Sequence, residues 1–169
     1  MPELPEVETT RRGIEPHVAG RTLTAVTVRE PRLRWPVDAR VSELGERRIL
    51  GLRRRAKYLL MDLGDLHLGI HLGMSGTLRV VAGGTPLRKH DHIDLHLDSG
   101  QLLRFNDPRR FGALLYLAEG LTHPLLANLG PEPLDDGFTG DWLHQRSRGR
   151  RVSVKSFIMD NATVVGVGN

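Results

Sequence analysis

Residues 93–105 read Ile-Asp-Leu-His-Leu-Asp-Ser-Gly-Gln-Leu-Leu-Arg-Phe, and this stretch indicates the fold class. Apolar and polar residues alternate over 93–97, which is typical of a strand with one buried face. Ser99 and Gly100 then supply a turn, and a second apolar run follows at 102–105. A strand, a tight turn and another strand predict an antiparallel hairpin.

Short strands of the same kind recur along the chain. We predict them at residues 23–29, 55–62, 66–71, 77–81 and 113–117. A helix is expected over about residues 4–18, because Val7, Ile14 and Val18 are spaced for one apolar side. Later helical stretches are expected at about 141–148 and from about 154. The expected fold is α+β and mainly β: a two-layer antiparallel β-sandwich flanked by the N-terminal helix.

The composition excludes several classes of protein. A chain of 169 residues has room for one compact domain with a short appended piece. Hydrophobic residues make up 39% and charged residues 26%, which fits neither a disordered chain nor a membrane protein. We therefore expect a cytoplasmic protein that does not enter membranes. Without cysteine, these residues contain no disulfide, no thiol nucleophile and no cysteine-ligated zinc.

The distribution of positive charge suggests an acidic partner. The formal net charge is +4, and only three of the 24 basic residues are lysines. Arginine suits bidentate contacts to phosphate, although genome base composition produces the same bias. Two basic runs without an acid span residues 47–57 and 146–155. Each predicts either a nucleic-acid contact or an ordinary solvated charged face.

The first six residues, Met-Pro-Glu-Leu-Pro-Glu, carry the most specific chemistry. Removal of Met1 would leave Pro2 with a free secondary amine, which is less basic than a lysine amine and therefore more nucleophilic at neutral pH. Attack on a sugar carbon yields an iminium ion that can drive β-elimination. Glu3 can act as a general acid or base, and Glu6 can orient the same site. A proline and acids at an ordinary helix start are the alternative explanation.

Seven motifs in order resemble bacterial formamidopyrimidine-DNA glycosylases, the bifunctional enzymes that remove oxidised purines. They are Met-Pro-Glu-Leu-Pro-Glu-Val-Glu-Thr (1–9), Arg-Arg-Ala-Lys-Tyr-Leu-Leu (54–60), His-Leu-Gly-Met-Ser-Gly (71–76), Lys-His-Asp-His (89–92), Asp-Pro-Arg-Arg-Phe-Gly (107–112), Leu-Gly-Pro-Glu-Pro-Leu (129–134) and Val-Val-Gly-Val-Gly-Asn (164–169). The resemblance covers the whole chain. Leu4 favours this branch over the related endonuclease VIII branch, which usually has glycine there.

The resemblance implies a role for each matching residue. Pro2 matches the Schiff-base nucleophile, Glu3 the catalytic proton donor, and Lys57 the lysine assigned to β-elimination and to a phosphate beside the lesion. The implied reaction is removal of 8-oxoguanine and formamidopyrimidines from duplex DNA, followed by β,δ-elimination at the abasic site. Glu6 joins this predicted catalytic group.

DNA contacts are implied at a second set of residues. These are His71, His90, Arg109, Arg150, Lys155 and Asn169. An enzyme that extrudes a base must also fill the vacated space in the stack. Met74, Arg109 and Phe111 match the trio that inserts into the duplex, with two apolar wedges and an arginine facing the orphaned base.

The resemblance also implies how the chain is organised. Residues 1–133 would form the catalytic domain, and residues 134–169 would begin a helix-two-turns-helix DNA-binding domain. The apolar last residues suggest a truncated chain that folds but is weakly active or inactive alone. Family members bind one zinc ion through a C-terminal finger that these residues lack, so we expect no cofactor here. The expected protein is a monomeric, nucleoid-associated bacterial enzyme whose partner is damaged double-stranded DNA.

Two other functions fit parts of the sequence. His90, His92, Asp94 and His96 alternate, so a strand would place all of them on one face, as in a metal-dependent hydrolase. A polar strand face explains the same pattern, and no second group of carboxylates accompanies it. The other alternative is a DNA-binding remnant without catalytic activity.

Overall fold

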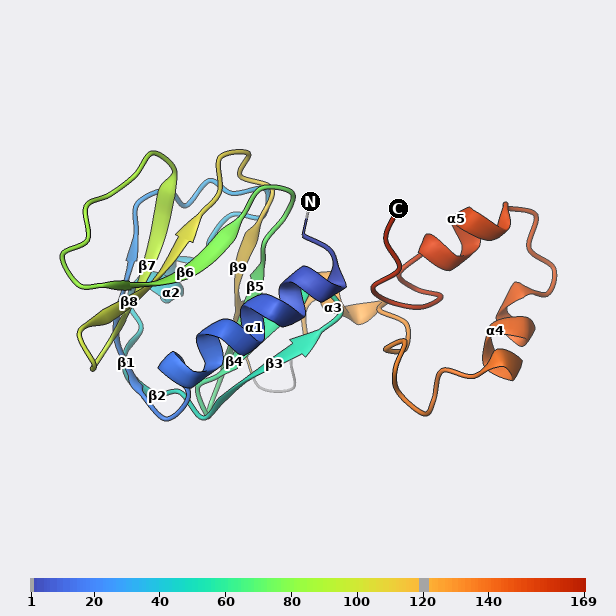
Figure 1. Cartoon of the computed structure of the whole chain (residues 1–169), viewed down its shortest axis with the longest axis horizontal. Coiled ribbons are helices and arrows are strands. Elements are labelled where there is room, and N and C mark those ends of the chain that lie inside the picture. Colours follow the sequence, from blue (N-terminus) through green and yellow to red (C-terminus); the bar gives the residue numbers. More distant parts are fainter. Residues whose placement is uncertain (1, 119–121) are drawn as a thin grey trace.

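The computed structural model describes residues 2–118 and 122–169, which form two lobes (Figure 1). The larger lobe contains two antiparallel sheets. In spatial order the first consists of β2 (Gly45–Arg48), β1 (Thr22–Val28), β7 (Asp91–Leu97), β8 (Gln101–Asn106) and β6 (Thr77–Ala82). The second consists of β3 (Gly51–Arg55), β4 (Tyr58–Asp62), β5 (His67–His71) and β9 (Ala113–Leu117). The predicted antiparallel β-sandwich is confirmed.

The hairpin that indicated the fold class lies within the first sheet. β7 and β8 pair in antiparallel register, with Leu95 opposite Leu103. Both side chains and Ile93 are almost completely buried. They meet Leu68 and other core residues of the second sheet in one hydrophobic cluster. Burial of this apolar surface is the main stabilising contribution to the sandwich.

Helix α1 (Leu4–Val18) closes one open side of the sandwich, as predicted for residues 4–18. It contacts β3 and β6, which are the edge strands of the two sheets. Val7, Ile14 and Val18 point into the core. The helix thus covers two strand edges and places its first turn at the end of the lobe that faces the second lobe (Figure 1).

The predicted strand at residues 55–62 is wrong at its beginning. Arg55 ends β3, Tyr58 begins β4, and Ala56 and Lys57 form the turn between them. Ala56 has a φ of +53°, a conformation that is uncommon for residues other than glycine. The sequence therefore does not predict a turn at this alanine. β2 and β3 were not predicted, because their arginine-rich sequences lack a regular apolar pattern.

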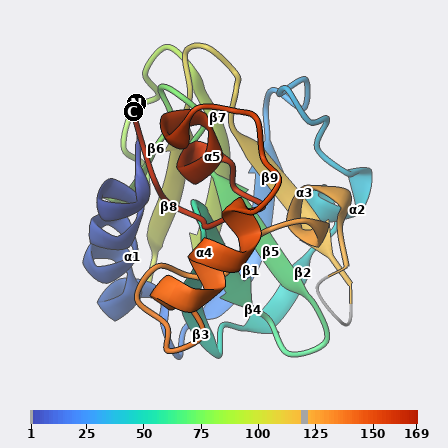
Figure 2. The same ribbon diagram turned by 90° about the vertical axis from the view of Figure 1, so that its right-hand side faces the viewer.

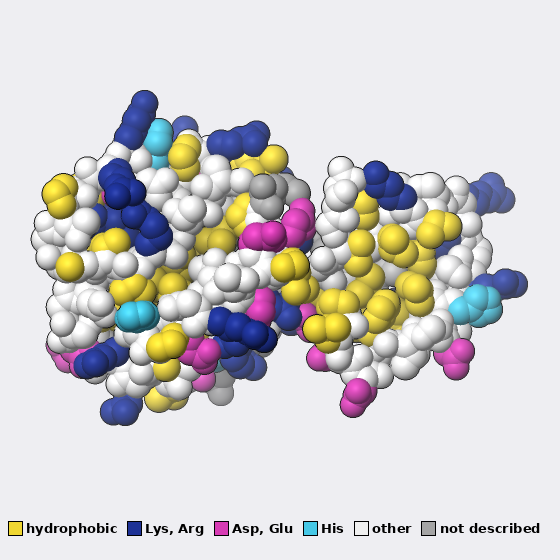
Figure 3. Space-filling view, in the orientation of Figure 1, with side chains coloured by type: hydrophobic (Ala, Val, Ile, Leu, Met, Phe, Trp, Pro, Cys, Tyr) yellow, Lys and Arg dark blue, Asp and Glu magenta, His cyan; other side chains and the backbone are white. Residues whose placement is uncertain are grey.

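The second lobe contains the helices α4 (Gly140–Ser147) and α5 (Val154–Met159), in agreement with the two predicted helical stretches. Two further helices are short: α2 (Ala39–Ser42) lies between β1 and β2, and α3 (Pro124–Ala127) lies between β9 and α4. The segment after α5 turns back, and Gly130 N–H donates to Asn161 O over 2.7 Å. Apolar side chains gather on one face of the lobe (Figure 3), and Val154 is 75% exposed.

None of the helices in the described parts of the chain is long and apolar enough to cross a membrane.

Candidate functional site

The first turn of α1 brings together several residues that the sequence marked as catalytic. Glu3 is the N-cap residue, and its backbone N–H donates a hydrogen bond of 3.0 Å to the Glu6 carboxylate. This bond holds the Glu6 side chain back against the start of the helix. Pro2, which is half-buried, directly precedes Glu3. Three of the four predicted catalytic residues therefore lie within one helical turn.

Lys57 completes this group from another element. It lies in the turn between β3 and β4, and its Nζ forms an ion pair and hydrogen bond with Glu3 Oε2. The Lys57 and Glu3 side chains are 20% and 24% exposed, so the pair is shielded from bulk water yet still open to a ligand. A carboxylate and an ammonium group thus stand together beside the residue that carries the proposed amine.

Residues 164–169 pack against the same helix start. Gly166 has a φ of +81°, and a Cβ there would lie 2.2 Å from Leu4 Cδ1. A Cβ on Gly168 would lie 2.7 Å from the Glu3 carboxylate. Only glycine permits so close an approach of the backbone. Residues 166–168 therefore lie against the start of α1, and the predicted site residue Asn169 directly follows them in the sequence. In Figure 2 the second lobe, with α4 and α5, faces the viewer.

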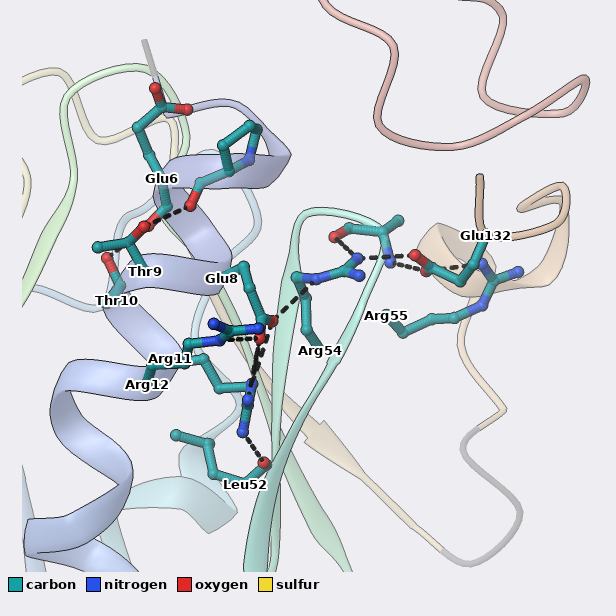
Figure 4. Close-up of polar contacts among 12 residues, drawn as sticks. Glu6, Glu8, Thr9, Thr10, Arg11, Arg12, Leu52, Arg54, Arg55 and Glu132 are labelled. Carbon is teal, nitrogen blue, oxygen red and sulfur yellow. Dashed lines mark hydrogen bonds and ion pairs between the residues drawn. The ribbon is translucent and has the colours of Figure 1, made fainter. Parts of the chain in front are cut away.

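An ion network fixes the turn that carries Lys57. Arg54 Nε lies 3.2 Å from Glu8 on α1, and Arg54 Nη1 lies 2.8 Å from Glu132 (Figure 4). Glu132 also pairs with Arg55 at 3.2 Å and accepts a 2.6 Å hydrogen bond from Ala56 N–H. The β3–β4 turn is therefore bound on one side to α1 and on the other to the segment leading into the second lobe.

The charges in this network are stabilised in their ionised forms. The hydrogen bond from Arg11, opposed by burial and reinforced by Arg12 and Arg54, lowers the pKa of Glu8 to about 2. Burial alone would raise the pKa of Glu132, but the bonds from Ala56 N–H and Arg54 outweigh it and lower that pKa. Both carboxylates are consequently charged at neutral pH.

Most residues of the first basic run are half-buried and form ion pairs with acids of the same chain. Arg47 pairs with Asp65 at 2.9 Å, and Arg54, Arg55 and Lys57 pair with the acids described above. Within the structurally described part of the chain, Arg48 and Arg53 are the members of this run that remain exposed without an ion-pair partner. The run at 47–57 therefore serves mainly to join elements.

Two connecting loops present the residues matched to the inserted trio. Met74 lies between β5 and β6, whereas Arg109 and Phe111 lie between β8 and β9. Met74 and Phe111 are 40% and 39% exposed, and the Arg109 guanidinium lies 4.8 Å from the centre of the Phe111 ring. A Cβ on Gly73 would lie 2.5 Å from the Phe111 carbonyl carbon, so the two loops touch. Arg109 and Phe111 are therefore in contact, and the loop that carries Met74 touches theirs.

Asp107 accepts hydrogen bonds from both loops. Its side chain is completely buried, with Oδ1 accepting from Ser75 Oγ over 2.7 Å and Oδ2 accepting from Gly112 N–H over 2.8 Å. Ser75 Oγ in turn accepts from Arg109 N–H over 3.1 Å. Asp107 and Glu132 lie inside two of the motifs quoted above, yet sequence reasoning gave neither a role, because each acts on the backbone and side chains of distant segments.

His71 lies beside the Lys57 turn, and its ring orientation is fixed. Nδ1 accepts a 2.9 Å hydrogen bond from Gly73 N–H, which leaves the proton on Nε2, and the Tyr58 ring packs against the imidazole at 4.7 Å. Burial lowers the pKa of His71, and the charges of Lys57 and Arg34 lower it further. A neutral imidazole with an outward N–H donor results.

The other predicted DNA contacts are more scattered. His90 has a φ of +71°, and its carbonyl oxygen accepts from Asp107 N–H over 3.1 Å, so it lies at the base of the Phe111 loop. Arg150 and Lys155 lie on the second lobe, where both are exposed and, among the residues described, have no ion-pair partner. The structure does not bring these two into the Glu3 group.

The strand that suggested a metal site has its polar groups engaged otherwise. His92 Nε2 lies 2.8 Å from Asp107 O, His96 Nε2 lies 2.8 Å from Thr27 Oγ1, and Asp94 pairs with Arg104 at 2.8 Å. No group of three or more potential metal ligands occurs within residues 2–118 and 122–169. With no cysteine in the sequence, the residues present do not fit a cysteine-ligated zinc.

Known proteins match this chain along its whole length. The formamidopyrimidine-DNA glycosylase from Alcanivorax borkumensis is 68% identical over 169 residues, covering all of this chain and 63% of that protein. The enzyme of the same name from Stenotrophomonas maltophilia K279a is 62% identical over 170 residues with the same coverage. The chain thus spans 63% of the length of these curated relatives.

Solved structures show the same fold. The Lactococcus lactis formamidopyrimidine-DNA glycosylase bound non-covalently to DNA containing an abasic site aligns with a TM-score of 0.87 and 32% identity, over 99% of this chain and 66% of that one. Its complex with DNA containing Fapy-dG aligns with a TM-score of 0.89 and 31% identity, over 99% and 64%. The family model described as the formamidopyrimidine-DNA glycosylase N-terminal domain matches residues 1–114. The chain belongs to the formamidopyrimidine-DNA glycosylase family.

Proposed function

We propose that this chain provides the catalytic machinery of a base-excision repair glycosylase and abasic-site lyase acting on oxidised purines in duplex DNA. The observation that carries the proposal is the Glu3–Lys57 ion pair beside Pro2, framed by Gly168. The names of the relatives and the DNA bound in the Lactococcus lactis complexes support the substrate class, which includes 8-oxoguanine and formamidopyrimidines.

Pro2 is the nucleophile in this proposal. With Met1 removed, the Pro2 nitrogen forms a bond to sugar C1′ while the bond from C1′ to the base breaks, and the base leaves with a proton. The Glu3 carboxylate takes up the N–H proton of Pro2 and donates it to the ring oxygen of the sugar, so the ring opens and the iminium ion forms. Loss of a C2′ proton then expels the 3′ phosphate by β-elimination, and a second elimination expels the 5′ phosphate. Glu6 orients the start of the helix.

Lys57 links binding of DNA to this chemistry. In the free protein its ammonium neutralises Glu3, and a backbone phosphate beside the lesion competes for the same ammonium. Transfer of Lys57 from Glu3 to phosphate frees the carboxylate for proton transfer. His71, with its outward N–H, and Asn169, beside Gly168, contact phosphates next to the lesion in this arrangement.

The exposed loops keep the extruded base out of the duplex. Met74 and Phe111 enter the vacated stack, and Arg109, already placed over the Phe111 ring, faces the orphaned base. His90, Arg150 and Lys155 are proposed to contact DNA further away.

We also propose that residues 1–133 form the catalytic domain and that residues 134–169 begin the helix-two-turns-helix domain. Zinc is proposed to belong to a part of the whole enzyme outside these residues. The enzyme is proposed to act as a monomer in the bacterial nucleoid. The chain spans 63% of the length of its relatives, so we also propose that these residues alone have weak activity or none.

Borohydride trapping on a duplex with an abasic site tests the nucleophile. The experiment uses this chain and a fusion that adds the remaining residues of the Alcanivorax borkumensis relative. We expect the fusion protein with a processed N-terminus to form a covalent adduct, this chain alone to form less or none, and neither protein to form it when the Pro2 amine is blocked by acetylation. A lysine amine can also be trapped by borohydride, and the sequence has three lysines. Lys89→Arg, at an exposed position, is the matched control and should keep the adduct. An undiminished adduct after acetylation would refute the assignment.

A DNA-binding module without catalysis is the second candidate, favoured by the 63% coverage of the relatives. It predicts specific binding of a duplex with a tetrahydrofuran abasic analogue but no adduct with either protein. Cleavage of a duplex with 8-oxoguanine opposite cytosine, in preference to undamaged duplex, would instead support the glycosylase.

A further inference from the structure

A cleft of about 330 Å³ lies next to the Phe111 loop. Its lining includes Arg34, Trp35, Tyr58, His71 and Phe111. Aromatic rings and cationic or neutral donors therefore make up most of its wall, and none of the described residues that line it is acidic. Such a surface suits a phosphodiester anion whose neighbouring sugar or base meets apolar groups.

The segment that carries Arg34 is fixed to the Phe111 loop. Arg34 N–H donates a 2.7 Å hydrogen bond to Arg110 O. The adjoining Trp35 packs edge-on against His123, with ring centres 5.1 Å apart. Arg34 therefore projects from a backbone that is held in place on both sides.

Arg34 differs from the arginines around it. Arg32 pairs with Glu30 at 2.8 Å, Arg110 pairs with Glu30 at 3.9 Å, and Arg40 pairs with Asp38 at 2.7 Å. The Arg34 side chain is exposed and has no hydrogen-bond or ion-pair partner in the described parts of the chain. The nearby carboxylates of Glu30 and Asp38 thus pair with other arginines. The Arg34 guanidinium is left available for an external anion.

His71 supplies a complementary donor on the same cleft. Its Nδ1 is occupied by Gly73 N–H, so Nε2–H is the group available to a ligand. Burial, Lys57 and Arg34 all lower the pKa of His71, so the imidazole adds a hydrogen bond without adding charge. One guanidinium and one neutral N–H match the needs of a singly charged phosphodiester.

We propose that Arg34 joins His71 in a subsite for one backbone phosphate of the DNA strand that passes the Phe111 loop, with Trp35 as its apolar wall. The proposal rests on the proposed function for the identity of the ligand. Arg34 is a binding residue in it, and it extends the path of phosphate contacts beyond Lys57 and His71.

The salt dependence of binding tests this subsite. Fluorescence anisotropy of a labelled duplex with a tetrahydrofuran abasic analogue is measured between about 50 and 200 mM KCl, with the substitutions made in the fusion protein used for borohydride trapping. Each phosphate contact contributes about 0.9 to the slope of log K against log salt concentration. We expect Arg34→Ala to lower the slope by about 0.9 and to weaken binding about tenfold at 100 mM KCl. Arg34→Lys should retain the slope.

Arg21→Ala is the matched control, because Arg21 is also exposed and lies at the far end of α1, near the start of β1. It should leave both the slope and the affinity unchanged. If Arg34→Ala behaves like Arg21→Ala while the unsubstituted fusion protein binds the duplex, the subsite is refuted and the proposed function survives. If the unsubstituted fusion protein fails to bind the duplex, both proposals are refuted.

Discussion

Ser75 Oγ donates a 2.7 Å hydrogen bond to Asp107 Oδ1, and this bond connects the loop of Met74 to the loop of Arg109 and Phe111. The same hydroxyl oxygen accepts from Arg109 N–H. A single side chain therefore satisfies a buried carboxylate and a backbone donor at once. The two loops that present Met74 and Phe111 thus depend on a polar contact between segments that are distant in sequence.

Ser75→Ala should destabilise the chain by about 1 to 3 kcal/mol, because Asp107 Oδ1 and Arg109 N–H both lose a partner. Urea unfolding followed by circular dichroism measures the change. Ser99→Ala is the control: Ser99 is exposed in the β7–β8 turn, and its loss should change stability by less than about 0.5 kcal/mol. Equal effects of the two substitutions would contradict the role assigned to Ser75.

Gly168→Ala should impair the site without unfolding the protein. The added Cβ would lie 2.7 Å from the Glu3 carboxylate and would push Glu3 away from Lys57. We expect the rate of borohydride trapping by the fusion protein to fall by about 10- to 100-fold, while the melting temperature changes little. Gly140→Ala is the control, because a Cβ there meets nothing within 4 Å. Unchanged trapping by Gly168→Ala would show that the contact with Glu3 is irrelevant to the chemistry.

Acid should weaken the ion network that holds the β3–β4 turn. The pKa of Glu8 is lowered from 4.5 to about 2, chiefly by Arg11, so ionised Glu8 stabilises the folded state at neutral pH. That contribution is complete above pH 4.5 and disappears as the pH falls toward 2. Urea midpoints should therefore drop between pH 5 and pH 3 in the wild type, and less so in Glu8→Gln.

Glu43→Gln is the control for this pH dependence, since Glu43 is exposed and without an ion-pair partner in the described residues. It should follow the wild-type profile. A Glu8→Gln protein whose profile is as steep as that of the wild type would place the acid sensitivity elsewhere, for example at Glu132.

Chelation should leave this chain unchanged. His92, Asp94 and His96 already have partners in the fold, so none of them is free to bind a metal ion. Incubation with EDTA should alter neither the melting temperature nor the binding of abasic duplex by the 169-residue chain. A clear loss of either property on chelation, restored by a divalent metal, would revive the metal-dependent hydrolase.

Local patterns in the sequence predicted the parts of the fold that depend on neighbouring residues. The spacing of Val7, Ile14 and Val18 is enough to define α1, because one helix face carries all three. The hairpin at β7 and β8 follows likewise from alternation and a turn. The family motifs predicted catalytic roles for Pro2, Glu3 and Lys57, and the fold places Glu3 and Lys57 in contact.

Long-range pairing was not accessible in the same way. Arg54 and Arg55 read as part of a basic surface, since nothing in their own segment indicates that Glu8 and Glu132 meet them. The turn at Ala56 was missed because the chain uses a non-glycine residue at positive φ there. Asp107 looked like one polar residue of a loop, and its complete burial emerges only when the two loops come together.

The contact between Gly168 and Glu3 forms after the sandwich core during synthesis of the chain. A nascent chain can bury the sandwich core before residues 164–169 have left the ribosome, because the core residues lie earlier in the sequence. Closure of so long a loop is a late and entropically costly step. The start of α1 is thus made first, and it gains its contacts with residues 166–168 only after the fold that supports it exists.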